Sequence, residues 1–166
     1  PWARLHLAQL LLERATRRFR ERAQAPMLAR ASALFTTMTG GRYAALRIDD
    51  DDGHPVLQAE RAPGQPGSAR VGIDALSEGT ADQLFLALRL AALDLRRGDG
   101  AGIAPPMPLV LDDVLMTADD ERATCVLQAL AEHAHGGQVL LFTHHRHLAE
   151  LAQARLAPSQ WLLHRL

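Results

Sequence analysis

The sequence contains no lysine, and all 18 of its basic residues are arginine. A phosphate-binding P-loop has the form GxxxxGK[ST], and its lysine reaches the outer phosphates of a nucleotide. The chain therefore cannot supply a complete P-loop. Any nucleotide site formed by these residues must be a partial one.

Cysteine is also scarce. Cys125 is the only one, which excludes an intramolecular disulfide and fits a reducing cytosol. No apolar run is long enough to span a bilayer and nothing resembles a secretory signal, so we expect a cytoplasmic protein with no membrane partner. The net charge of −1 and the pI of about 6.8 argue neither for nor against nucleic acid. Because the chain begins at Pro1, we expect it to be a piece of a longer protein.

Apolar residues make up 48% of the 166 residues, which is enough for one domain with a real core. Two short apolar strands are predicted, at residues 109–111 and 138–142, and helical segments alternate with them. Buried strands in such an alternation indicate a parallel sheet covered on both faces, so we predict an α/β fold. Function in these sheets collects at the carboxyl ends of the strands. Asp112, Asp113 and His144 all lie at such ends.

The most informative segment, residues 76–95, reads LSEGTADQLFLALRLAALDL. Its apolar residues fall on nearly every face of a predicted helix, which indicates a buried helix. Ser77, Gly79 and Thr80 mark the helix start, where the first N–H groups lack partners and the dipole is positive. Gly79 lets a ligand approach the backbone and Ser77 adds a hydroxyl, so this start is suited to an anion such as phosphate. The alternative is an ordinary N-cap on a core helix.

The amino-terminal segment, residues 2–23, has a helical pattern in which Leu5, Leu12 and Phe19 lie seven residues apart. This is the spacing of a short coiled coil. The segment carries six arginines and two glutamates, so it is locally basic. It would suit either a solvated outer face or a contact with a phosphate backbone. We expect Pro26 to break this helix.

The segments between these motifs read more simply. Residues 27–37 are predicted to form a second helix, and residues 42–48 and 56–60 two strands joined by an acidic turn. Residues 49–52 of this turn are four carboxylates, which could suggest a metal cluster. Adjacent side chains on an extended segment point apart, so a solvated hairpin turn is favoured. Residues 161–163 are predicted to form a terminal strand.

Two carboxylates after an apolar strand form the arrangement by which nucleoside triphosphatases hold magnesium. The first, Asp112, would bind the hydrated ion, which keeps most of its waters. The second, Asp113, would orient or deprotonate the attacking water. His144, at the end of a neighbouring strand, would contact the outer phosphate and sense it. The alternative for a lone histidine is simple hydrogen bonding.

Three motifs resemble those of ABC-type ATPases and follow the same order along the chain. LSEGTADQ looks like the signature motif, with Ser77 and Gly79 matching the serine and second glycine of LSGGQ. LVLDDVLMTAD looks like Walker B and the D-loop. In it, Asp113 and Asp119 lie six residues apart, the interval between the catalytic glutamate and the D-loop aspartate in that family. LLFTHH looks like the switch-histidine loop, with His144 in the matching place.

The amino-acid sequences of these motifs are most similar to those of the SMC, SbcC and RecF branch and, within it, to the YhaN-like AAA proteins of bacteria. Such a head is divided in sequence: an N-terminal lobe carries Walker A, a long coiled coil follows, and a C-terminal lobe closes the head. The resemblance implies that residues 1–25 end the returning coiled coil and that residues 26–166 are the C-terminal lobe. The implied fold is half of a P-loop NTPase head, with a mostly parallel sheet flanked by helices.

The resemblance also implies a mechanism in which two heads of a homodimer hold two ATP molecules and Mg²⁺ between them. Each ATP would contact Walker A and Walker B of one head and signature residues of the other, here Ser77, Glu78, Gly79 and Thr80, together with Asp119. Hydrolysis would release the heads, and the coiled coils would convey this to DNA. The implied partners are the N-terminal lobe, the second head, DNA and a nuclease of the metallophosphoesterase type. This chain alone is expected to be inactive.

Two positions depart from the family pattern. Asp113 replaces the usual glutamate with a carboxylate one methylene shorter, which predicts slower or differently placed water activation. Aspartate at this position resembles the RecF-like and YhaN-like members. Thr80 stands where LSGGQ has glutamine, which puts that contact with phosphate in question.

Two other functions fit the sequence. The first is a catalytically decayed head that acts as an ATP-gated dimerisation or DNA-binding module. The second is a metal-binding or hydrolytic protein, because imidazole is a common metal ligand and five histidines lie close together: His133, His135, His144, His145 and His147. The first two of these are two residues apart at a predicted helix end, so they would point to different faces.

Overall fold

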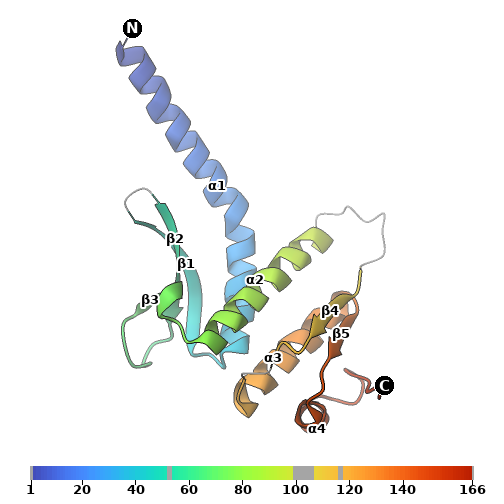
Figure 1. Ribbon diagram of the computed structural model, residues 1–166. Helices are drawn as coiled ribbons and strands as arrows, with labels where there is room; N and C mark the ends of the chain where they lie inside the picture. The colour runs from blue at the N-terminus through green and yellow to red at the C-terminus, as the bar shows by residue number, and fades with distance from the viewer. Residues whose placement is uncertain (1, 52–53, 99–106, 116–117, 166) are drawn as a thin grey trace.

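The computed structural model describes residues 2–51, 54–98, 107–115 and 118–165 (Figure 1). Along the chain the elements are α1 (Trp2–Met38), β1 (Tyr43–Asp51), β2 (His54–Arg61), β3 (Arg70–Gly72), η1 (Ile73–Ala75), α2 (Glu78–Gly98), β4 (Leu109–Asp112), α3 (Asp120–His133), η2 (Ala134–Gly136), β5 (Val139–Phe142) and α4 (Arg146–Arg155). Figure 1 shows α1 projecting from a body that the other elements form. Among the described residues, no helix is both long and apolar enough to cross a membrane.

Helix α1 has 37 residues and continues through Pro26. The prediction that Pro26 breaks the helix is therefore wrong, and no break separates residues 1–25 from the rest. Proline inside a helix removes the hydrogen bond to the carbonyl four residues earlier, which costs about 3 kcal/mol or more. The following turns are fixed by the burial of Ala31, Leu34 and Phe35, which overrides the local preference.

Two glycines end α1 and turn the chain into β1. Gly40 and Gly41 have φ values of 61° and 77°, a left-handed conformation that glycine adopts without a steric penalty. The Gly41 N–H donates to the Thr36 carbonyl at 2.8 Å, and the Gly40 N–H donates to the Thr37 carbonyl at 3.1 Å. The last turn of the helix is therefore capped within the chain.

The strands form two sheets, an antiparallel one in the order β1-β2-β3 and a parallel one of β4 and β5. Pairing of β1 with β2 from Tyr43↔Arg61 to Asp51↔His54 confirms the predicted hairpin. The predicted acidic turn is too long, because Asp49–Asp51 extend β1, and residue 52 lies outside the described residues. The short strand β3 was not predicted. The parallel pair and its helices confirm the α/β class, but in the described part of the chain parallel pairing is limited to these two strands.

Helices α1, α2 and α3 enclose the core. The largest fully buried side chains are Phe35, Met38, Leu84, Leu90 and Val126. The expectation that α2 is buried on nearly every face is wrong for the face that carries Phe85. This residue is 51% exposed, although Leu84 next to it is fully buried. No described element covers that face of the helix.

A cluster of charged side chains ties the base of α1 to α2 and α3. Asp94 of α2 lies 2.6 Å from Arg30 Nε of α1, and its other oxygen lies 2.9 Å from His133 Nδ1 of α3. The His133 side chain is fully buried, and this burial lowers its pKa, so the neutral ring is favoured. Neither ring nitrogen of His133 makes an aligned hydrogen bond within the described residues. The contact with Asp94 is therefore close but poorly directed.

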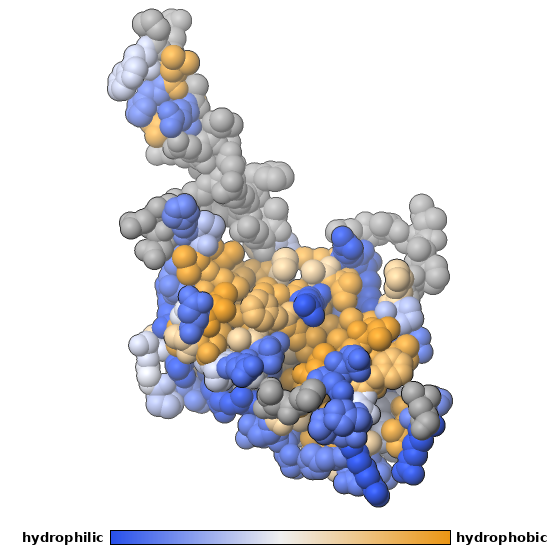
Figure 2. Space-filling view, in the orientation of Figure 1, coloured by the Kyte–Doolittle hydropathy of each residue, from blue (hydrophilic) through white to orange (hydrophobic). Residues whose placement is uncertain are grey.

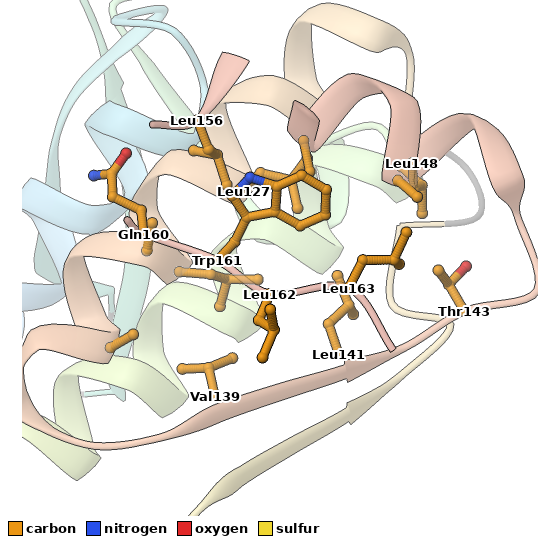
Figure 3. Close-up of a pocket in the computed structure, with 15 residues that line it drawn as sticks. Leu127, Val139, Leu141, Thr143, Leu148, Leu156, Gln160, Trp161, Leu162 and Leu163 are labelled. Carbon is orange, nitrogen blue, oxygen red and sulfur yellow. The ribbon is translucent and has the colours of Figure 1, made fainter. Parts of the chain in front are cut away.

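The segment after α4 covers a cavity of about 190 Å³ between α3, β5 and α4 (Figure 3). Trp161, Leu162 and Leu163 line this cavity together with Leu127 and Leu141. The prediction of a strand at residues 161–163 is wrong, since the described residues after α4 contain no strand. Trp161 packs against the core, whereas Leu162 and Leu163 line the cavity mouth and stay 78% and 47% exposed.

Candidate functional site

Two strand ends bring the predicted catalytic residues together. The register of the parallel strands β4 and β5 sets Asp112 opposite Phe142. Parallel strands present their carboxyl ends at one edge of a sheet, so the residues that follow β4 meet those that follow β5. The Asp113 N–H donates to the Phe142 carbonyl at 3.0 Å and extends the pairing by one residue. Asp113 and His144 share this edge, as the sequence predicted.

Asp113 is fixed by His144. Its Oδ2 lies 2.8 Å from His144 Nδ1, and its Oδ1 accepts from the His144 N–H at 3.4 Å. Among the described residues, Asp113 is the only non-glycine with a positive φ, at 47°. A backbone in this region costs roughly 1–3 kcal/mol and persists where the surroundings impose it, often at functional sites. Aspartate is one of the few residues that tolerate it.

The electrostatics of the pair favour a charged carboxylate. The hydrogen bond from the His144 side chain lowers the pKa of Asp113, so this residue stays ionised around neutral pH. A carboxylate of lowered pKa is a weak base but a good hydrogen-bond acceptor. Asp113 is therefore better suited to orient a water molecule than to remove its proton. The side chains of Asp113 and His144 are 29% and 65% exposed, so a ligand can reach both.

The predicted magnesium ligand, Asp112, is exposed at the last position of β4. Its carboxylate is a hard oxygen donor of the kind that Mg²⁺ binds while keeping several waters. The exposed position leaves space for such a hydrated ion. Asp112 therefore fits magnesium, and its role as a ligand stays a prediction.

The start of α2 faces outward. The Ser77 carbonyl accepts the N–H groups of Thr80 and Ala81, both at 2.9 Å, and so opens the helix. Ser77 and Glu78 are exposed and Gly79 is half-buried. The outward position of Ser77 and the amides of the first turn suits the predicted contact with an anion.

Thr80 has a different position from its neighbours. Its side chain is 3% exposed, and its hydroxyl lies 2.8 Å from the Ser77 hydroxyl. This contact fixes the Ser77 side chain at the helix start. Thr80 therefore faces Ser77 and the interior, while Ser77, Glu78 and Gly79 lie at the surface.

A groove of about 340 Å³ separates α2 from the residues after β4. Gly79, Phe85 and Arg89 line one side, and Asp113 and Val114 line the other. Figure 2 shows apolar surface across the middle of this face of the molecule. A contiguous apolar surface of this kind usually marks a binding site for another polypeptide.

Asp119, predicted to lie in a D-loop, caps α3. Its Oδ1 accepts from the Arg122 N–H at 2.9 Å, and its Oδ2 lies 3.2 Å from Arg122 Nε. The side chain is nevertheless 61% exposed. Asp119 thus sits at a turn that can meet another molecule, and its contact with ATP stays a prediction.

The clustered histidines do not form one site. His133 is buried at the base of α1, His135 is exposed on η2, and His147 faces the start of α3. Only His144 and His145 lie together, with ring centroids 4.0 Å apart. A site built from all five histidines is therefore contradicted. His145 beside Asp113 was not predicted, because adjacent residues do not reveal in sequence which way their rings turn.

No family model matches the chain. Its sequence is 27% identical over 151 residues to the protein YhaN of Bacillus subtilis. The match covers 90% of this chain but only 14% of YhaN. The chain therefore corresponds to a small part of that relative.

Solved structures of SMC proteins have the same fold. One SMC ATPase, from a study of ATP-driven dimerization and DNA-stimulated activation, matches with a TM-score of 0.60 and 19% identity over 80% of this chain and 75% of its own. The SMC head of Thermotoga maritima gives 0.53 and 21% over 76% and 40% of the two chains. The head of Pyrococcus yayanosii Smc gives 0.59 and 17% over 84% and 25%. The chain has the fold of SMC head domains, and the resemblance predicted from its motifs is confirmed.

Proposed function

We propose that this chain is the C-terminal lobe of an SMC-type ATPase head, which hydrolyses ATP with Mg²⁺ together with an N-terminal lobe of the same protein. The observation that most supports this is the 2.8 Å contact of Asp113 with His144 at the carboxyl ends of two parallel strands. Such a pair supplies a group that orients water and a group that meets phosphate. Without lysine the chain has no P-loop, so we expect it to be inactive alone.

Each residue of the strand edge has a distinct role in this proposal. Asp112 would hold the magnesium ion, which offsets phosphate charge when it is bound. Asp113 would accept a hydrogen bond from the attacking water and align it with the terminal phosphate. His144 turns Nδ1 toward Asp113, which leaves its Nε2 available to the phosphate.

The start of α2 would complete the site of a second head. Ser77 and Glu78 are exposed, and Ser77 lies next to first-turn amides that have no partners within the helix. The Ser77 hydroxyl and the amide of Gly79 would donate to the phosphates of an ATP held by the other head. Asp119, exposed at the start of α3, would lie at the same interface between heads. ATP would thereby join the two heads of a homodimer.

The N-terminal lobe would cover the open apolar face. Phe85, Val110 and Phe142 are 51%, 57% and 44% exposed. Burying apolar surface is favourable by about 25 cal/mol per Å². A two-stranded sheet is also marginal by itself, and further strands would complete it. Strands from the N-terminal lobe beside β4 and β5 would satisfy both needs.

The coiled coil and DNA complete the proposed cycle. Helix α1 leads away from the body (Figure 1) and carries the arginine-rich segment. Arginines that contact a phosphate backbone bind without sequence preference and in a salt-dependent manner. We extend the proposal to DNA through this helix. The described residues offer no support for a nuclease partner, so the proposal stops short of one.

The decisive experiment is ATP turnover by the intact protein, with both lobes and Mg²⁺ present. Asp113→Asn keeps the shape of the side chain but removes its charge, and we expect turnover to fall by about 100-fold or more. Asp120→Asn is the matched control, since it removes a nearby exposed carboxylate outside the proposed site, and turnover should change little. Equal turnover by the wild-type protein and Asp113→Asn would instead indicate a decayed head that serves for dimerisation or DNA binding.

A further inference from the structure

Three side chains that could bind a metal ion converge beside the proposed hydrolytic residues. Asp113 follows β4, and His144 and His145 follow β5. One possible ligand atom from each of the three lies within 4.8 Å of the others. Among the described residues, these are the ones that group in this way. We refer to them as the Asp113–His144–His145 cluster.

The spacing in the cluster is near that of a metal site. Two ligands that lie about 2.0–2.2 Å from a tetrahedral zinc ion are about 3.3–3.6 Å apart. Asp113 Oδ2 and His144 Nδ1 are 2.8 Å apart in their hydrogen-bonded pair, so an ion would replace this hydrogen bond and move the two atoms apart by about half an ångström. The rings of His144 and His145 have centroids 4.0 Å apart and an interplanar angle of 36°. Consecutive residues usually send their side chains apart, but here both rings lie on the same side of the chain.

Local hydrogen bonds preorganise the turn that carries the two rings. The His145 N–H donates to the Thr143 hydroxyl at 3.1 Å, and His145 is the N-cap residue of α4. The Asp113 carboxylate holds the His144 ring from the other strand end. Ligands whose orientation is fixed in this way lose little freedom when a metal binds.

One atom of the cluster lacks a protein partner. His145 Nε2 is buried and makes no hydrogen bond within the described residues. Buried ring nitrogens are normally satisfied, so such an atom calls for a partner. A metal ion that binds an imidazole nitrogen would be such a partner.

We propose that Asp113, His144 and His145 bind a first-row transition-metal ion of the zinc class. Two imidazoles and one carboxylate suit zinc, whereas magnesium prefers an all-oxygen octahedron. Three protein ligands leave a fourth position open to water. This ion differs from the magnesium ion proposed at Asp112, in both its ligands and its chemical class.

Binding of this ion would have a consequence for ATP hydrolysis, and this consequence alone rests on the proposed function. A zinc ion on the cluster would occupy the carboxylate of Asp113 and the ring of His144. Neither group could then serve the water or the phosphate. Zinc should therefore inhibit ATP turnover, and a chelator should restore it.

The test is calorimetric titration of Zn²⁺ into the intact, chelator-treated protein without nucleotide. We expect one strong site per chain, which His145→Asn weakens at least about tenfold. Asparagine is a favourable N-cap, so the start of α4 is preserved. The matched control is His147→Asn, which removes a neighbouring histidine outside the cluster and should leave the affinity unchanged. Asp113→Asn provides a second variant and should also weaken binding.

Several results would overturn the proposal. These are the absence of a strong Zn²⁺ site, an affinity that His145→Asn and Asp113→Asn leave unchanged, and an equal loss in His147→Asn, which would mean nonspecific binding by surface histidines. A second measurement, ATP turnover with Mg²⁺ and added Zn²⁺, should show inhibition of the wild-type protein and resistance of His145→Asn. Zinc binding without any ATP turnover would contradict only the proposed function.

Discussion

The two parts of the candidate site differ in where their partners lie. At the strand edge, Asp113 is held by His144 and by the backbone of Phe142, all within one chain. At the start of α2, Ser77 and Glu78 face outward. The first part is held together within this chain, while the second is exposed at its surface, where we propose that a second head binds. The same division runs through α2, which buries one face in the core and leaves the other open.

The largest effect should separate the two faces of α2. Leu84 is fully buried and Phe85 is 51% exposed, although they are neighbours. Leu84→Ala would leave a cavity and lower the free energy of unfolding by about 2–5 kcal/mol. Phe85→Ala should lower it by less than about 1 kcal/mol in a chain without its N-terminal lobe. Urea unfolding of both variants measures this difference. Equal losses of unfolding free energy would mean that Phe85 is buried in solution.

A second prediction concerns the outward-facing helix start. Ser77→Arg places a bulky side chain where the phosphate of the other head would lie. We expect ATP-dependent dimerisation to be lost and turnover to fall by about 100-fold, as when a positioned donor is removed from a charged transition state. Ser68→Arg, at an exposed loop position, is the control. Sedimentation with and without ATP reports dimerisation, and a dimer that persists in Ser77→Arg would contradict the assignment.

A third prediction addresses how α1 is attached to the body. Asp94 contacts Arg30 at 2.6 Å and His133 at 2.9 Å. Asp94→Asn would leave the half-exposed Arg30 and the buried His133 without their charged partner and lower the free energy of unfolding by about 1–3 kcal/mol. Glu60→Gln removes a solvent-screened ion pair with Arg47 and should have a much smaller effect. Thermal unfolding measures the stability of both variants. Equal destabilisation would show that the contacts of Asp94 stabilise the fold no more than an exposed ion pair does.

The smallest effect is a dependence of stability on pH through His133. Burial lowers the pKa of His133 below its ordinary value of 6.5, so the unfolded state binds the proton more readily than the folded state. This contribution to stability is complete above pH 6.5 and is lost as the pH falls below it. The slope from one such group is at most about 1.4 kcal/mol per pH unit. His133→Gln should flatten this part of the profile, and an unchanged slope would exclude His133 as its source.

The sequence predicted the strand edge well because its information is local. An apolar strand followed by carboxylates, and a second one followed by histidines, sufficed to bring Asp113 and His144 together, since parallel strands share one edge. The hairpin from β1 to β2 was predicted for a similar reason, because two runs of strand-forming residues flank one acidic segment, although Asp49–Asp51 of that segment extend β1. Patterns confined to adjacent residues therefore translated directly into structure.

The features that sequence reasoning missed depend on packing between distant segments. Pro26 ought to break a helix, but burial of the next turns keeps α1 continuous. The burial of Thr80 against Ser77 also depends on packing, and its contact with phosphate stays the open question that the motif raised. The exposed face of α2 was predicted to be core because apolar residues alone do not distinguish a buried face from an exposed one. The ring of His145 depends on the turn into α4, which no motif encodes.

The central claim, that this chain completes the ATP site of a neighbour, can be tested by mixing two inactive variants of the intact protein. A dimer of Asp113→Asn with Ser77→Arg contains one site with both defects and one site with neither. Because Ser77→Arg is not expected to form dimers with itself, turnover is compared per mixed dimer. The account then predicts about half of the wild-type ATP turnover for each mixed dimer, from its one intact site of two. If the mixture remains as inactive as either variant alone, while both variants are folded and present as mixed dimers, then Ser77 and Asp113 do not act across a shared interface.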